Sequence, residues 1–186
     1  MYTHVYLSEI RRIRTKKTRQ DKHNPSSEHR ILSEEKEKIR TEDSIQQESM
    51  HILHVDDDAS FLKVSKMILE LKDKFEIDSA TSVEEAFHKL ETQTYDAIIC
   101  DYDISTKNGL DFLKELREQR NNIAFIIFTG MGTEEIVIRA INLGADYYID
   151  KYGSPEEVYL ELANAVRKTV ERKKKARSIR GESPAS

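Results

Sequence analysis

The stretch Ile52-Leu53-His54-Val55-Asp56-Asp57-Asp58 places a short apolar run directly before three consecutive carboxylates. A bounded apolar run of this length is typical of a buried strand, here residues 51–55. Apolar residues then recur at helical spacing, at Phe61, Val64, Ile68 and Leu71. The stretch therefore predicts a buried strand followed by an amphipathic helix over residues 59–72.

The same alternation of strand and helix is repeated toward the carboxyl end. Further strands are expected over residues 75–80, 95–100, 124–128 and 147–150. The helices that follow them are expected to begin at Ser82 (a capping box with Glu85), Gly109, Thr133 and Ser154, the last running to about residue 170. Strands that are apolar on both faces and separated by helices indicate a parallel sheet covered on both sides. Right-handed crossovers make this a doubly wound α/β fold of five strands and five helices.

Charge divides the chain into three parts. The net charge is +2 over residues 1–49, −12 over residues 50–165 and +6 over residues 166–186. The first part has too few apolar residues to offset the entropy cost of ordering, so residues 1–49 are expected to be mostly disordered. We expect residues 50–170 to form the folded domain and residues 171–186 to be a basic, solvated tail.

Composition excludes several classes of protein. The single cysteine among 186 residues rules out a disulfide framework and a cysteine-based zinc cluster, and indicates a reducing compartment. No apolar run approaches the roughly 18–20 residues of a membrane span, and no secretory signal begins the chain. We therefore expect a soluble, cytoplasmic protein. Few residues follow the last predicted helix, so no attached output domain is expected. Met50 would be a natural start, which leaves open whether residues 1–49 belong to the natural protein.

Four of the five predicted strands end in a polar side chain. Asp56 and Asp57 follow the first strand, Asp101 the third, Thr129 the fourth and Lys151 the fifth. In an open parallel sheet, ligands bind beyond the carboxyl ends of the strands, where the strand order reverses. If the order is 2-1-3-4-5, the first and third strands are neighbours, and these five residues line one pocket.

Asp56, Asp57 and Asp101 would form a cluster of carboxylates that repel one another unless a positive charge offsets them. Oxygen-only ligands favour Mg²⁺ or Mn²⁺. Such a site supports phosphoryl transfer to a carboxylate, because Asp101 can act as a nucleophile without losing a proton. The metal and Lys151 would neutralise charge on the phosphoryl oxygens, and Thr129 would donate a hydrogen bond to one of them.

Five motifs match one known family in order and spacing. They are Ile52-Leu53-His54-Val55-Asp56-Asp57-Asp58, Ile98-Ile99-Cys100-Asp101, Asn108-Gly109-Leu110, Phe128-Thr129-Gly130 and Tyr147-Tyr148-Ile149-Asp150-Lys151. Through these motifs, residues 51–165 resemble the receiver domain of two-component response regulators. The resemblance implies a stand-alone receiver with a flavodoxin-like sheet of order 2-1-3-4-5.

The resemblance also implies a role for each acidic residue of the predicted site. Asp101 would be the phosphoacceptor, and Asp56 and Asp57 the acidic pair that binds the metal. The backbone carbonyl of Asp103 would complete the metal shell. The ion would therefore be Mg²⁺ or Mn²⁺ held by Asp56, Asp57, Asp101 and Asp103.

The remaining roles concern the response to phosphorylation. By the same resemblance, Thr129 and Lys151 would sense the phosphoryl group. Tyr148 would be the switch aromatic, turning inward when Thr129 moves toward that group. Gly109 and Gly130 would support the loops around the site.

Two positions depart from the family pattern. Ser105 stands where most receivers have a proline, and Tyr152-Gly153 replaces the proline after the lysine, where a cis peptide often aims the lysine side chain. A cis bond before Tyr152 would cost about 2.5–4 kcal/mol more than trans. We therefore expect this loop to be built differently, with Gly153 supplying flexibility. His54 and Cys100, inside predicted buried strands, are expected to be core residues.

The expected function is a phosphorylation-controlled binding switch rather than an enzyme. The protein would take a phosphoryl group from a histidine kinase or a phosphotransfer protein and then engage an unknown downstream protein. Slow autodephosphorylation would be its only hydrolase-like activity. Nucleic-acid contact through the basic ends stays open as a minor alternative.

Two alternatives belong to other functional classes. A pseudo-receiver scaffold would work without phosphate if the altered loop at Lys151 disabled the pocket. The sequence Asp101-Tyr102-Asp103 also resembles the opening motif of haloacid-dehalogenase-type phosphatases. Those enzymes need a further acidic pair on a strand after their lysine, whereas only Glu156 and Glu157 follow Lys151, at a helix start.

Overall fold

The computed structural model describes residues 49–105 and 107–181. Strands and helices alternate along them in the order β1 (Met50–Val55), α3 (Ala59–Lys72), β2 (Phe75–Ala80), α4 (Val83–Thr92), β3 (Ala97–Cys100), α5 (Gly109–Glu118), β4 (Ala124–Thr129), α6 (Glu134–Asn142), β5 (Tyr147–Asp150) and α7 (Pro155–Arg180). The disorder predicted for residues 1–49 concerns a segment that, apart from Ser49, lies outside the described residues.

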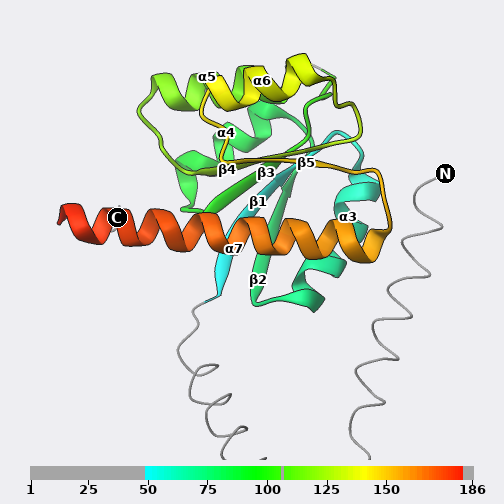
Figure 1. Cartoon of the computed structure of the whole chain (residues 1–186), viewed down its shortest axis with the longest axis horizontal. Helices are drawn as coiled ribbons and strands as arrows, with labels where there is room; N and C mark the ends of the chain where they lie inside the picture. Colours follow the sequence, from blue (N-terminus) through cyan, green and yellow to red (C-terminus); the bar gives the residue numbers. More distant parts are fainter. Residues whose placement is uncertain (1–48, 106, 182–186) are drawn as a thin grey trace, which may run out of the picture.

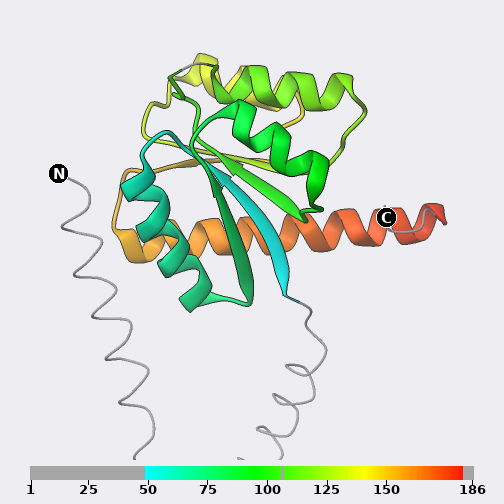
Figure 2. The same ribbon diagram turned by 180° about the vertical axis from the view of Figure 1, so that it is seen from behind.

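The strands form one sheet in the order β2-β1-β3-β4-β5, and all four pairs are parallel. Helices α3 and α7 cover one face of the sheet, while α4, α5 and α6 cover the other (Figures 1 and 2). Each face has its own apolar core, one centred on Ile52, Ile99 and Phe128 and the other on Leu53 and Phe125. The predicted doubly wound fold and its strand order are confirmed.

The helices begin at polar caps that satisfy their first backbone N–H groups. The Asp58 carboxylate accepts hydrogen bonds from the N–H groups of Ser60 and Phe61, at 2.9 and 3.0 Å. Ser82, Thr133 and Ser154 cap α4, α6 and α7 as predicted, and Asn108 caps α5. The capping box of α4 differs in one bond, because the Glu85 carboxylate accepts from the N–H of Thr81.

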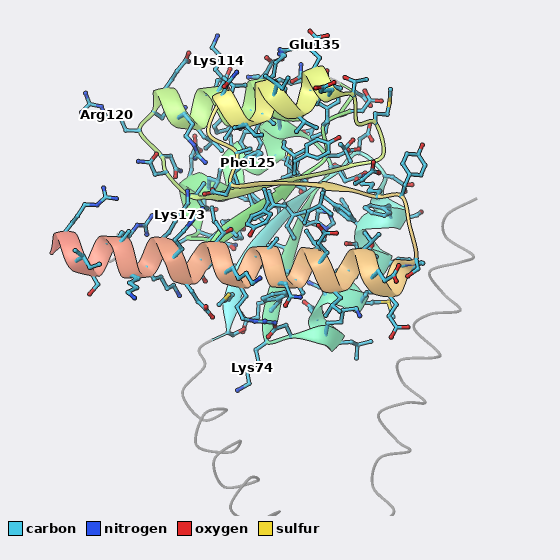
Figure 3. All side chains as sticks on the ribbon, viewed as in Figure 1. Lys74, Lys114, Arg120, Phe125, Glu135 and Lys173 are labelled. Atoms are coloured by element: carbon cyan, nitrogen blue, oxygen red, sulfur yellow. The ribbon has the colours of Figure 1, made fainter. Side chains whose placement is uncertain are left out.

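Strands β1 and β4 are each one residue longer than predicted, and two further boundaries differ for a structural reason. Strand β3 begins at Ala97 rather than at residue 95, because the Asp96 carboxylate accepts the backbone N–H of His51 at the strand entrance. Helix α7 does not end near residue 170 but continues to Arg180. Its basic second half finds partners, such as Lys173 on the side of α7 that faces the sheet (Figure 3). The first ten residues of the expected basic tail are therefore helical.

Among the described helices, none is both long enough and apolar enough to cross a membrane.

Candidate functional site

The carboxyl ends of four strands bring the predicted site residues to one edge of the sheet. Val55 of β1 is in register with Cys100 of β3, so the residues that follow them, Asp56 and Asp101, are neighbours. Thr129 is the last residue of β4, and its register partner on β5 is Asp150, which Lys151 follows. Parallel strands end at the same edge, which is why side chains up to 95 positions apart in sequence meet here.

Lys151 joins the carboxylates of β1 and β3. Its Nζ lies 2.6 Å from Oδ2 of Asp56 and 3.2 Å from Oδ2 of Asp101. The other oxygens accept backbone N–H groups, from Asp58 to Asp56 at 2.9 Å and from Tyr102 to Asp101 at 2.7 Å. Burial raises the pKa of Asp56, and the Lys151 ammonium only partly opposes this effect.

Asp57 lies at the same edge but has a different partner. Its Oδ2 accepts the backbone N–H of Ser105 at 3.2 Å and also the Ser105 hydroxyl. Ser105, which stands where most receivers have a proline, therefore holds the carboxylate of Asp57. Asp103 is exposed in the loop between β3 and α5.

A divalent cation suits the chemistry of this donor set. Asp56, Asp57 and Asp101 contribute three carboxylates against the single ammonium of Lys151, so negative charge is in excess. Within residues 49–105 and 107–181, no three ligand side chains stand ready around a point in space. Lys151 lies between two of the carboxylates, and Ser105 engages the third. The residues fit an oxygen-liganded ion chemically, because carboxylate oxygens are the ligands that Mg²⁺ and Mn²⁺ prefer.

Thr129 is almost fully buried at the end of β4. Its hydroxyl oxygen accepts the backbone N–H of Met131 at 3.2 Å, within the loop that follows. Its backbone carbonyl accepts the N–H of Lys151 at 2.8 Å. The hydroxyl therefore faces its own loop, and it is tied to Lys151 through the main chain.

Tyr148 turns its hydroxyl into the protein. The hydroxyl is buried and has no hydrogen-bond partner among the described residues. A Cβ atom at Gly132 would lie 2.4 Å from this oxygen, so a side chain at position 132 would force the tyrosine ring to shift. Burial raises the pKa of Tyr148, followed in effect by the charges of Asp150 and Asp101. Sequence reasoning missed Gly132, although two glycines in three residues after Thr129 could have pointed to it.

The two glycines expected to support the loops differ in their surroundings. A Cβ at Gly109 would lie 2.1 Å from the backbone oxygen of Asp101, so only glycine lets α5 begin this close to that residue. A Cβ at Gly130 would lie 3.9 Å from that of Lys151, which is ordinary contact. Space around the site therefore requires glycine at position 109 but not at position 130.

The loop after Lys151 contains only trans peptide bonds, as do all the described residues. The Asp150 carboxylate accepts the N–H of Tyr152 at 2.8 Å, and Gly153 has a positive φ of 132°. The expectation that this loop is built differently from a cis-proline loop is confirmed, and Gly153 supplies a conformation that other residues rarely adopt.

His54 and Cys100 lie beneath the site as core residues, as predicted. Burial, followed in effect by the Lys151 ammonium, lowers the pKa of His54 to about 3. Burial raises the pKa of the Cys100 thiol well above its ordinary value. Both side chains are therefore uncharged near neutral pH, and Lys151 is the cation that faces the carboxylates.

Comparison with known proteins gives a consistent result. The family model described as "Response regulator receiver domain" matches residues 52–163. Among curated proteins, response regulator SaeR of Staphylococcus aureus is 32% identical over 114 residues, which cover 61% of this chain and 49% of SaeR. The chain thus spans about half the length of the curated relatives it matches.

Solved structures give the same match over most of the described chain. A receiver domain of the Francisella response regulator 1452 is 26% identical with a TM-score of 0.60, covering 67% of this chain and 98% of that one. A receiver domain protein from Clostridium thermocellum is 29% identical with a TM-score of 0.60, covering 67% and 97%. Response regulator TrrA from Thermotoga maritima, solved in complex with Mg²⁺-BeF, is 26% identical with a TM-score of 0.54, covering 62% and 98%.

Proposed function

Because the chain belongs to the response regulator receiver domain family, we propose that it is a phosphorylation-dependent switch of a two-component phosphorelay. Asp101 is the phosphoacceptor in this proposal. The observation that supports it most strongly is the contact of one lysine, Lys151, with both Asp56 and Asp101 in a pocket where carboxylates are in excess.

The proposed step transfers a phosphoryl group from a phosphohistidine to a carboxylate oxygen of Asp101. A bond forms between that oxygen and phosphorus while the phosphorus–nitrogen bond of the donor breaks, and the electron pair leaves with the imidazole. Lys151 lies 3.2 Å from Asp101 and can move its ammonium to the new phosphoryl oxygens. The Thr129 hydroxyl would exchange its contact with the loop for one of these oxygens.

We assign Mg²⁺, or Mn²⁺ in its place, to the carboxylates of Asp56, Asp57 and Asp101 with the backbone carbonyl of Asp103. When bound, the ion supplies positive charge that offsets the phosphoryl oxygens. Burial of Asp56 beside a shared ammonium supports the assignment, since a carboxylate with a raised pKa gains from a cation. The complex of TrrA with Mg²⁺-BeF is a relative's precedent for it.

The proposed partners are a histidine kinase or phosphotransfer protein as donor and a downstream protein as target. The surface change would begin at Thr129 and Tyr148. The buried hydroxyl of Tyr148 has no hydrogen-bond partner among the described residues. Family membership makes the haloacid-dehalogenase alternative untenable. The phosphate-independent scaffold becomes an outcome of the test.

The test is labelling of the full chain with a small acyl phosphate in Mg²⁺, read by intact mass. Wild type should gain one phosphoryl group and Asp101→Asn none. The matched control is Asp96→Asn, which removes a carboxylate at the opposite end of β3 and should label normally. Labelling of Asp101→Asn would contradict the acceptor assignment, and an unlabelled wild type would favour the scaffold.

A second variant separates chemistry from response. Lys151→Ala should retain part of the labelling but lose the conformational change, followed by tyrosine fluorescence or NMR because the chain has no tryptophan. A normal conformational change in Lys151→Ala would contradict the switch mechanism.

A further inference from the structure

Lys151 reaches the carboxylates along a wall of two aromatic rings. Its Nζ lies 4.3 Å from the centroid of the Phe61 ring and 5.6 Å from that of Phe128. The two rings are 6.0 Å apart and tilted by 38°, so the ammonium lies against both. Separations below about 6 Å allow attraction between a cation and the negative face of a ring.

The rings belong to elements that are held firmly against the sheet. Phe61 lies in the first turn of α3, and its backbone N–H is bonded to the capping carboxylate of Asp58. Phe128 is fully buried on β4, and Tyr159 of α7 braces it edge-on at 5.9 Å. Both rings are therefore held by contacts that do not involve the lysine side chain.

The main chain around Lys151 does not by itself set the direction of the side chain. The N–H of Lys151 is bonded to the carbonyl of Thr129, and the next residue, Tyr152, is bonded to Asp150. No cis peptide bond aims the lysine, and its side chain has four rotatable bonds. The ammonium, whose side chain is 15% exposed, is held by its side-chain contacts: the carboxylates of Asp56 and Asp101 and the two rings. The rings are the contacts that can persist when the ammonium changes oxygen partners.

We propose that Phe61 and Phe128 are positioning residues that keep the Lys151 ammonium in the site, both when it pairs with carboxylates and when it turns to a phosphoryl group on Asp101. The second of these states rests on the proposed function, and the first rests on the contacts above. A ring face attracts a cation over its whole area, so the ammonium can change oxygen partners without leaving the wall.

The test lowers the electron density on the face of one ring while keeping the ring close to its original shape. In the full chain, 4-fluorophenylalanine and 3,4,5-trifluorophenylalanine replace Phe61, which weakens the negative face in steps. The matched control places the same residues at Phe112, which packs on the other face of the sheet against Phe87 and Phe125. Binding of beryllofluoride in Mg²⁺ is followed by tyrosine fluorescence.

Each added fluorination at position 61 should weaken the binding of beryllofluoride. With the trifluorinated ring the Kd should be about tenfold higher than in wild type, equivalent to about 1.4 kcal/mol. The same replacement at position 112 should change it less than about twofold. Equal losses at both positions, or no loss at position 61, would overturn the inference.

A second measurement does not depend on phosphoryl chemistry. In the NMR spectrum of the unmodified protein, the Cε protons of Lys151 should be displaced upfield by the ring currents, and Phe61→Leu should reduce this displacement. Ordinary Cε shifts in wild type would overturn the inference. If wild type does not bind beryllofluoride, the proposed function fails, while the proton shifts still decide the positioning role.

Discussion

The two edges of the sheet carry the same kinds of side chain in opposite proportions. At the carboxyl edge, Asp56, Asp57 and Asp101 lie together, and among the described residues Lys151 is the one cation paired with them, contacting Asp56 and Asp101. Burial raises the pKa of Asp56 despite that cation, which shows that its charge is incompletely offset.

At the amino edge, cations outnumber the carboxylates they meet. Asp146 pairs with Arg172 at 2.7 Å and Lys173 at 2.8 Å, and Arg117 lies 3.7 Å away. Lys174 pairs with Asp96 at 2.9 Å. The basic half of α7 supplies most of these cations. This segment, which the sequence suggests is a solvated tail, therefore forms ion pairs with the amino end of the sheet.

The comparison shows how a binding site differs from a cluster of ion pairs that only stabilises the fold. We call the cluster at the amino edge the brace; it consists of Asp96, Asp146, Arg117, Arg172, Lys173 and Lys174. Carboxylates with matched cations and backbone donors are already satisfied and stabilise the fold. Carboxylates in excess are held together at a cost and favour any ligand that brings positive charge. The predictions below compare the two edges on this basis.

The largest expected effect is loss of the brace. Asp146→Ala should lower the free energy of unfolding by about 3 kcal/mol, because it leaves Arg117 and Lys173 without their carboxylate and the N–H of Phe125 without an acceptor. Urea denaturation measures this. At the other edge, Asp101→Asn keeps an acceptor for Tyr102 and should change the same quantity by less than about 1 kcal/mol. Equal losses in the two variants would break the comparison.

The next effect is stabilisation by a divalent cation at the carboxyl edge alone. At a concentration ten times its Kd, Mg²⁺ should raise the free energy of unfolding by about 1.4 kcal/mol, and a chelator should reverse this. The gain should vanish in Asp57→Asn and persist in Lys174→Ala, which alters the amino edge. Thermal denaturation with and without Mg²⁺ distinguishes the two, and a gain that survives in Asp57→Asn would refute the metal assignment.

The pH dependence of stability should have opposite signs for Asp56 at the carboxyl edge and for Asp78, which lies within β2. Burial alone would raise the pKa of Asp78, but the hydrogen bond from Tyr95 and the charge of His51 outweigh it and lower the pKa. Asp78 therefore adds stability above its unfolded pKa, and this is lost as pH falls through the folded pKa. The raised pKa of Asp56 means that the folded state holds its proton longer, so stability is lost as pH rises from the unfolded to the folded pKa.

Urea denaturation of Asp78→Asn and Asp56→Asn from about pH 3 to 7 tests these signs. Relative to wild type, Asp78→Asn should lose stability as pH rises, and Asp56→Asn should gain it. Parallel pH curves for the two variants would show that the crowded carboxylate Asp56 and the satisfied carboxylate Asp78 do not differ in the way proposed.

The smallest effect concerns an exposed ion pair of the brace. The side chain of Lys174 is 51% exposed where it meets Asp96. Lys174→Ala should therefore cost only about 0.5 kcal/mol, and the loss should shrink in high salt. A loss as large as that of Asp146→Ala would mean that the stability provided by the brace depends on the number of ion pairs rather than on how deeply they are buried.

Much of the carboxyl edge could be predicted from sequence because the position of each site residue depends on the strand directly before it. Apolar runs define the strands, and the residue after each run is placed by the strand itself. Once the strands are parallel, Asp56, Asp101 and Lys151 must meet at one edge. The caps at Ser82 and Ser154 are equally local, because each bonds an N–H three residues ahead.

The parts that sequence reasoning missed depend on partners distant along the chain. Phe61 has the spacing of an ordinary core residue, and nothing near it announces a lysine 90 positions later. The helical extension of α7 was missed because its acceptors, Asp96 and Asp146, come together only when the amino ends of the strands assemble. The role of Gly132 could be recognised only once the position of the Tyr148 hydroxyl was known.

The ion pair between Lys151 and Asp56 also has a consequence for the order of folding. The two residues are 95 positions apart, and Lys151 directly follows β5, the last strand. Long-range contacts of this kind form late, since the chain between them must first be ordered. A nascent chain that ends after β4 would hold its carboxylates without their lysine. We therefore expect the conformational response to phosphorylation, which depends on Lys151, to appear only after β5 has docked.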